Sequence, residues 1–182
     1  GAHTVAVNAI LLQLILLQSY ILDGFANATE AKVGQFYQQK PQLQRFLNSS
    51  FLLSFAAAFL LLLAFCAAYP LLPAIFTSQT QVIAQLNKSL WFVIFMPLLA
   101  FPAYWLDGVA VGLAASKAMR NASLAASLLI FVPFVLVLMH FWPGNTSLWL
   151  CFVAFTVSRW LFLALFLRRS AFTFLPRVVL SA

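Results

Sequence analysis

The chain has 182 residues, of which 64% are hydrophobic and 7% are charged, and its formal net charge is +7. Soluble domains carry about 25% charged residues because their surface faces water, so this composition excludes an ordinary soluble globule and predicts a surface that faces membrane lipid. The basic residues lie between apolar runs, as they do in loops on the cytoplasmic side of a membrane, and nucleic acid is therefore not an expected partner.

Five apolar segments are long enough to span a bilayer as helices, which takes about 20 residues each. Their apolar runs are continuous and do not alternate as the strands of a membrane barrel would. We expect an all-α, polytopic bundle over residues 1–169, followed by a basic cytoplasmic tail at residues 170–182. The five spanning helices are predicted at residues 4–33, 46–69, 90–115, 124–141 and 148–167.

The connections between these segments carry residues that end helices or favour turns. Loops are predicted at residues 38–42, 77–81, 116–121 and 143–145. One side of the bundle then receives most of the basic residues, namely Lys32, Lys40, Arg45, Lys117, Arg120, Arg168, Arg169 and Arg177, and the other side receives Lys88. The positive-inside rule therefore predicts a multi-pass protein of the cell inner membrane, with its N-terminus outside and its C-terminus in the cytoplasm.

All three acidic residues, Asp23, Glu30 and Asp107, lie within predicted helices. A charge at the bilayer centre costs at least about 2.5–3.5 kcal/mol, so intramembrane carboxylates face a cavity or a partner and often handle protons or cations. Asp23, Asn27 and Glu30 are spaced i, i+4 and i+7, which predicts one polar face of the first helix that points into the bundle. Arg159 is the expected ion-pair partner of one carboxylate.

A seven-residue pattern, Tyr-x-Leu-Asp-Gly-x-Ala, occurs at residues 20–26 and again at residues 104–110. Internal repeats are common in secondary transporters, whose binding sites lie between the repeats, although chance or shared packing needs would also produce such a match. Tyr20, Tyr104 and Gln13, which lies seven residues before Tyr20, are therefore candidates to line a substrate cavity.

The residues around the two repeats suggest how the helices pack. Gly24 and Gly108 directly follow the repeated aspartates and predict close approach of a neighbouring helix. Pro97 and Pro102 precede Asp107 in the third helix, where a proline removes a backbone hydrogen bond and favours a kink.

Catalytic motifs are absent from the sequence. It contains no phosphate-binding glycine-rich loop, no metal-spaced Cys/His set and no nucleophile elbow. Two helix-borne aspartates would also suit an intramembrane aspartyl protease, but both sites read Leu-Asp-Gly and lack the Gly-x-Gly-Asp surroundings of such enzymes. We therefore expect a protein that is not an enzyme and has neither cofactor nor metal.

A series of short motifs extends along nearly the whole chain, to about Arg169. They are Leu22-Asp23-Gly24-Phe25-Ala26, Glu30-Ala31-Lys32-Val33-Gly34-Gln35, Leu106-Asp107-Gly108, Met119-Arg120-Asn121, Gly144-Asn145, Leu148-Trp149-Leu150 and Arg159. In this combination they resemble helices 8–12 of the multidrug and toxic compound extrusion (MATE) transporters, in their DinF-like branch. That family has twelve helices in two lobes, so the resemblance implies part of the C-terminal lobe and, as a partner, the N-terminal lobe of the same protein.

The resemblance also implies a function, which is cation-coupled antiport by alternating access. H⁺ or Na⁺ would enter while a bulky, often cationic organic compound leaves. Asp107, Asp23 and Glu30 match acidic positions of the family and would couple the cation, with Arg159 and Asn27 in support. Lys32 departs from the family pattern, which more often has an apolar residue there. Two alternatives stay open: a lipid-linked oligosaccharide flippase of the same superfamily, and a non-functional truncated half-transporter.

Overall fold

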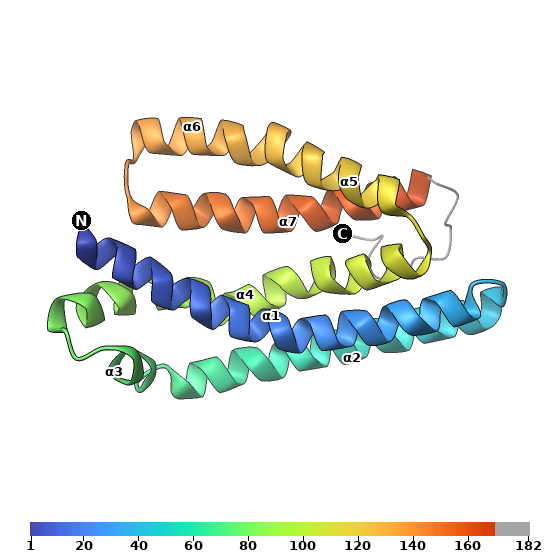
Figure 1. Cartoon of the computed structure of the whole chain (residues 1–182), viewed down its shortest axis with the longest axis horizontal. Coiled ribbons are helices and arrows are strands. Elements are labelled where there is room, and N and C mark those ends of the chain that lie inside the picture. The colour runs from blue at the N-terminus through green and yellow to red at the C-terminus, as the bar shows by residue number, and fades with distance from the viewer. Residues whose placement is uncertain (170–182) are drawn as a thin grey trace.

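The computed structural model describes residues 1–169 as a bundle of long helices (Figure 1). Five helical segments in this part of the chain are long and apolar enough to cross a membrane, which confirms the predicted all-α polytopic fold. The elements are α1 (Ala2–Phe36), α2 (Lys40–Ala68), α3 (Leu72–Phe76), α4 (Thr80–Gly112), α5 (Ser116–Ala125), η1 (Ala126–Phe131), α6 (Val132–Phe141) and α7 (Asn145–Arg169). α5, η1 and α6 form one continuous span.

Helices extend into all four segments that were predicted as loops, and the largest differences are at α4 and α5. α4 begins at Thr80, because Val82, Leu86 and Leu90 are spaced at i, i+4 and i+8 and are all buried, so this polar segment still has an apolar stripe to pack. Residues 116–121 form the start of α5 rather than a loop, and the connection before it is residues 113–115. The short helix α3 was not predicted; Pro73 lies in its first turn, where proline is favoured.

Successive spans run in opposite directions, so the connections gather at the two ends of the bundle (Figure 1). The connections at residues 37–39 and 113–115 lie at the same end as the C-terminal end of α7. The basic residues predicted to share one side lie near that end, apart from Arg177, which with the predicted tail at residues 170–182 lies outside the described residues. Which end faces the cytoplasm stays a prediction.

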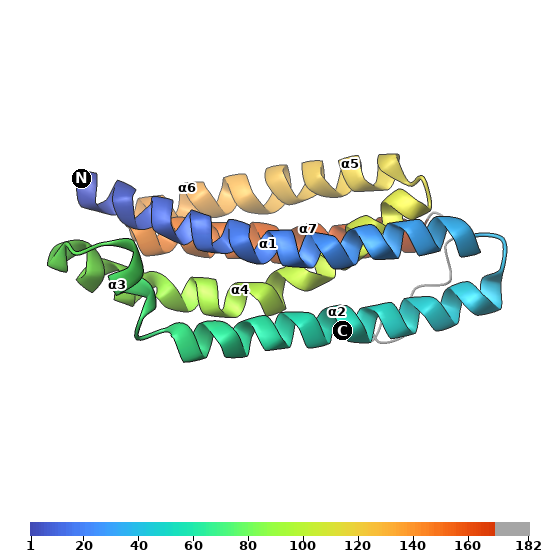
Figure 2. The ribbon, with the colours of Figure 1, turned by 60° about the horizontal axis from the view of Figure 1, so that its bottom comes forward.

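α4 is the central helix and contacts α1, α2 and α7. Figures 1 and 2 show α5, η1 and α6 lying along α7, with α2 on the opposite side of the bundle. Most of α4 is buried in this arrangement, whereas the span from α5 to α6 is mainly exposed. The residues of α4 therefore decide which groups of the other helices meet in the interior.

Two glycines of α4 make a close contact with the backbone of α1. A Cβ atom at Gly112 would lie 2.7 Å from the carbonyl oxygen of Glu30, and one at Gly108 would collide with the carbonyl oxygen of Ala26. Small residues four positions apart permit such close crossings in membrane helices. A Cβ at Gly24 would meet nothing within 4 Å, so the predicted close contact is confirmed for Gly108 and wrong for Gly24.

Candidate functional site

An ion pair links α4 to α7 inside the bundle. Nη2 of Arg159 donates a hydrogen bond to Oδ2 of Asp107 over 2.7 Å, and its Nε donates to Oγ of Ser123, on α5, over 3.4 Å. The second carboxylate oxygen, Oδ1 of Asp107, is buried and has no hydrogen-bond partner among residues 1–169. A buried polar atom without a partner is costly, so this oxygen is a position where a proton, a cation or a water molecule would be stabilised.

The direction of the Asp107 side chain follows from the packing of its neighbours on α4. Successive residues of an α-helix are rotated by about 100°, so residues 105–108 point to different sides. Trp105 donates from Nε1 to Oγ of Ser50, on α2, over 3.0 Å, while Gly108 lies against α1. With its α2 and α1 sides held in this way, α4 presents Asp107 to α7.

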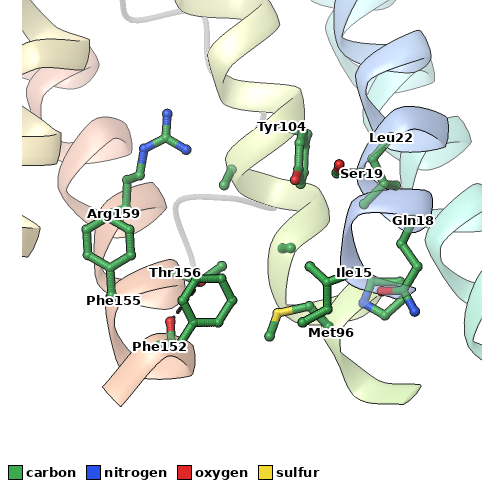
Figure 3. Close-up of a pocket in the computed structure, with 13 residues that line it drawn as sticks. Ile15, Gln18, Ser19, Leu22, Met96, Tyr104, Phe152, Phe155, Thr156 and Arg159 are labelled. Atoms are coloured by element: carbon green, nitrogen blue, oxygen red, sulfur yellow. Dashed lines mark hydrogen bonds between the residues drawn. The ribbon is translucent and has the colours of Figure 1, made fainter. Parts of the chain in front are cut away.

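A cavity of about 170 Å³ lies beside this ion pair, between α1, α4 and α7 (Figure 3). Its wall is mainly apolar. The polar residues that line it are Gln18, Ser19, Tyr104, Thr156 and Arg159.

Arg159 connects the two features, because it lines the cavity and also holds Asp107. Figure 3 shows it on the opposite side of the cavity from Ser19 and Gln18. A change in the ion pair would therefore alter one wall of the cavity.

Tyr104 is the predicted cavity residue that the structure places in the cavity wall. The structure does not bring Tyr20 and Gln13 there: both are exposed on α1, with Tyr20 exposed by 65%. The buried stripe of α1 includes Leu14, Gln18 and Leu22 at intervals of four residues, and Tyr20 and Gln13 fall outside it.

Sequence reasoning missed Gln18, Ser19 and Thr156 as cavity residues. A signal was present for Gln18, since it is a polar residue within the apolar stripe of α1. The two hydroxyl residues offered no such signal, because serine and threonine occur throughout the chain.

The polar face predicted on α1 does not point into the described bundle. Asp23 and Asn27 are exposed and Glu30 is half-buried, so the prediction of an inward face is wrong for this part of the chain. The physical reason is that α1 buries its smaller and apolar side chains, including Ala26 and Val33, against the glycines of α4. The polar side chains are left on the outside.

Asp23 is nevertheless within electrostatic reach of the cavity region. Its charge interacts with both Asp107 and Tyr104, and the Tyr104 hydroxyl also interacts with the side chain of Ser19. This interaction of Asp23 with Asp107 is weaker than that of Arg159, which is hydrogen-bonded to the carboxylate.

The two copies of the repeat pack near one another, since Ala26 of the first copy contacts Gly108 of the second. The repeated leucines, Leu22 and Leu106, are both buried, as are the repeated alanines, Ala26 and Ala110. The repeated aspartates differ, because Asp23 is exposed and Asp107 is ion-paired. Shared packing thus accounts for the Leu and Ala of the pattern, and it does not account for the Asp.

Five apolar spanning helices, packed around an internal ion pair and a cavity, define the chain as a polytopic helical membrane protein. Over 172 residues it is 33% identical to DNA damage-inducible protein F of Escherichia coli (strain K12). The match supports the resemblance to the DinF-like branch of the MATE family.

The extent of the match differs between the two proteins. It covers 93% of this chain and 37% of DNA damage-inducible protein F, so the chain spans little more than a third of that relative's length. No protein-family model and no solved structure matches the chain.

Proposed function

We propose that this chain forms part of a cation-coupled transporter in which H⁺ or Na⁺ competes with Arg159 for the carboxylate of Asp107. One observation carries the proposal: Asp107 binds Arg159 through Oδ2 alone, and its buried Oδ1 has no partner in the described part of the chain. The similarity to a DinF protein and the adjoining cavity support a transport function. The polytopic fold and the absence of catalytic motifs from the sequence favour this class over an enzyme.

The proposed coupling step is a change of charge at Asp107. A proton or Na⁺ bound at Oδ1 reduces the negative charge that holds the Arg159 guanidinium. Inside a protein an arginine that loses its counter-charge carries a large desolvation penalty, so Arg159 moves toward another acceptor or toward water. Because Arg159 belongs to α7 and Asp107 to α4, the two protonation states favour different arrangements of these helices. Alternating access requires such a shift between two conformations.

The remaining predicted residues would support this step from α1. Asp23 interacts electrostatically with Asp107, and Asn27 and Glu30 continue from Asp23 toward the basic end of the bundle. Carboxylates that face lipid are costly, so we propose that the N-terminal lobe of the same protein, or a water-filled cleft next to it, covers this face of α1. The cations would then reach Asp107 along it.

The transported compound and the orientation belong to the same proposal. We propose export of small organic compounds across the inner membrane, with the basic end of the bundle in the cytoplasm, in line with the positive-inside rule. A lipid-linked oligosaccharide flippase is less well supported, because it needs a strongly basic cavity and the Arg159 charge that lines this one is paired with Asp107.

The test is efflux by the complete gene product that contains this chain, reconstituted in vesicles with an imposed H⁺ or Na⁺ gradient. Asp107→Asn keeps the size of the side chain and removes the titratable charge, so gradient-driven export of a fluorescent organic cation should be lost. Lys88→Gln is the control and should transport normally, because Lys88 lies toward the end of the bundle opposite its basic end. Unaltered efflux by Asp107→Asn would overturn the assignment of Asp107 as the coupling residue.

A further inference from the structure

The cavity between α1, α4 and α7 has the features of a binding site of its own. We infer that it binds a small, uncharged ring compound that carries an N–H or O–H donor, and that Gln18 recognises this donor. The inference rests on the proposed function only in that such a compound would belong to the transported class.

Gln18 is the first support for this inference. Its side chain is 2% exposed and lines the cavity. Its Nε2 donates to the carbonyl oxygen of Val93, on α4, over 3.0 Å, which holds the amide in one orientation. Its Oε1 is buried and has no hydrogen-bond partner among residues 1–169. The atom that Gln18 leaves without a partner is therefore an acceptor, and burying an acceptor without a partner is unfavourable. A ligand that donates a hydrogen bond would satisfy it.

Two hydroxyl groups of the cavity wall, those of Ser19 and Thr156, are also acceptors toward a ligand. Ser19 donates its hydroxyl hydrogen to the carbonyl oxygen of Leu16 over 2.7 Å, and Thr156 donates to that of Phe152 over 2.9 Å. Serine and threonine in helices commonly form this local bond, which leaves only their lone pairs available. Gln18, Ser19 and Thr156 therefore select for a hydrogen-bond donor.

The size and the apolar wall of the cavity indicate a ring. Its volume of about 170 Å³ is slightly larger than the roughly 150 Å³ of a cavity that holds benzene in another protein. Ile15, Met96, Phe152 and Phe155 line it (Figure 3). Aromatic rings pack favourably against such side chains.

The charge in the wall indicates that the ring compound is uncharged. The Arg159 guanidinium is paired with Asp107, and the described wall contains no carboxylate. A charged ligand would therefore find no unpaired counter-charge in the described wall, whereas a neutral donor needs none.

Two probes that differ by one donor test the inference directly, namely indole and 1-methylindole. Binding to the complete gene product in nanodiscs would be measured by isothermal titration calorimetry, with empty nanodiscs as the blank. Leaving a buried acceptor unpaired is penalised, so we expect indole to bind about tenfold more tightly than 1-methylindole. Equal affinities for the two probes would overturn the inference.

Three variants then locate the site. Gln18→Leu removes the acceptor within an apolar stripe and should abolish the preference for indole, whereas Gln13→Leu, exposed on the same helix, should retain it. Ala100→Leu fills the cavity from α4 and should prevent binding of both probes. Ala100→Leu leaves Gln18 unchanged. Its effect on probe binding therefore shows whether the probes bind in this cavity, even if Gln18→Leu does not fold. A preference that persists in Gln18→Leu, or binding that persists in Ala100→Leu, would contradict the inference.

The binding test and the transport test fail separately. Loss of efflux in Asp107→Asn together with equal binding of the two probes would remove this inference and leave the proposed coupling intact. Selective indole binding together with normal efflux in Asp107→Asn would remove the proposed coupling and leave this inference intact.

Discussion

Asp107 on α4 and Arg159 on α7 are 52 positions apart in the chain, and a single hydrogen bond of 2.7 Å joins them. The carboxylate uses one oxygen in this bond and keeps the other buried and unpaired within residues 1–169. Arginine and carboxylate groups frequently pair through two parallel bonds, so this pair leaves one acceptor unused. The consequences for stability can be measured apart from transport.

Removing Arg159 should destabilise the protein because it leaves the Asp107 charge without a partner. Breaking a fully buried pair costs about 3–5 kcal/mol. The side chains here are 30% and 23% exposed, so we expect a loss of about 1–3 kcal/mol for Arg159→Gln. Thermal or denaturant unfolding of the purified protein would measure it. The double variant Asp107→Asn with Arg159→Gln should recover part of the loss, and a double variant less stable than Arg159→Gln alone would contradict this account.

Gly108→Ala should disrupt the contact between α1 and α4, because its Cβ would collide with the backbone carbonyl of Ala26. A backbone atom cannot move aside as a flexible side chain can, so we expect a loss of about 2 kcal/mol or more, in the range of an overpacked core. Unfolding temperature in detergent is the measurement.

Gly24→Ala is the matched control for this substitution. Gly24 holds the same place in the first repeat but has open space around it. Alanine there should be neutral or stabilise α1 by up to about 1 kcal/mol, the difference in helix propensity between the two residues. Equal losses in the two glycine variants would mean that the close helix contact does not matter.

Ala114→Gly should stabilise the connection between α4 and α5. Ala114 follows the end of α4 with a φ of 54°, in the left-handed region that favours glycine. Ala115 N–H donates to the carbonyl of Ala110 and Ala114 N–H to that of Val111, the two bonds of a Schellman motif. Relief of the left-handed strain predicts a gain of about 1 kcal/mol. As a control, Ala125→Gly inside the helical span should have the opposite sign, and a loss on Ala114→Gly would refute the prediction.

Asn8→Ala should loosen the end of the bundle where α1 and α7 begin. Asn8 and Asn145 form two reciprocal amide hydrogen bonds of 2.8 Å, and Nε1 of Trp149 donates to Oδ1 of Asn8 over 3.0 Å. Loss of Asn8 leaves these partners unsatisfied, at a cost of about 1–3 kcal/mol. Hydrogen exchange should become faster in the first turns of α1 and α7. Asn87→Ala, an exposed asparagine on α4, is the control, and unchanged protection in Asn8→Ala would argue against a role for this network.

The sequence by itself determined the five spanning helices found within residues 1–169. Spanning depends on the hydropathy of about 20 consecutive residues, and such a local property does not need knowledge of neighbouring helices. The start of α4 was harder to predict from the sequence, because residues 80–89 are polar on average and become helical by burying one stripe against other helices. Their conformation depends on a contact, which the local sequence does not contain.

For the functional site, too, some features followed from the sequence and others depended on the tertiary structure. Residue type and position singled out Asp107 and Arg159, since an ionisable side chain in an apolar helix is costly wherever the helix packs. Only the tertiary structure decided that Arg159 pairs with Asp107, that Gln18 lines the cavity, and that Asp23 and Asn27 face outward. Those outcomes depend on how each helix is rotated about its axis. That rotation is determined by contacts between distant segments, such as Gly108 against the backbone of α1.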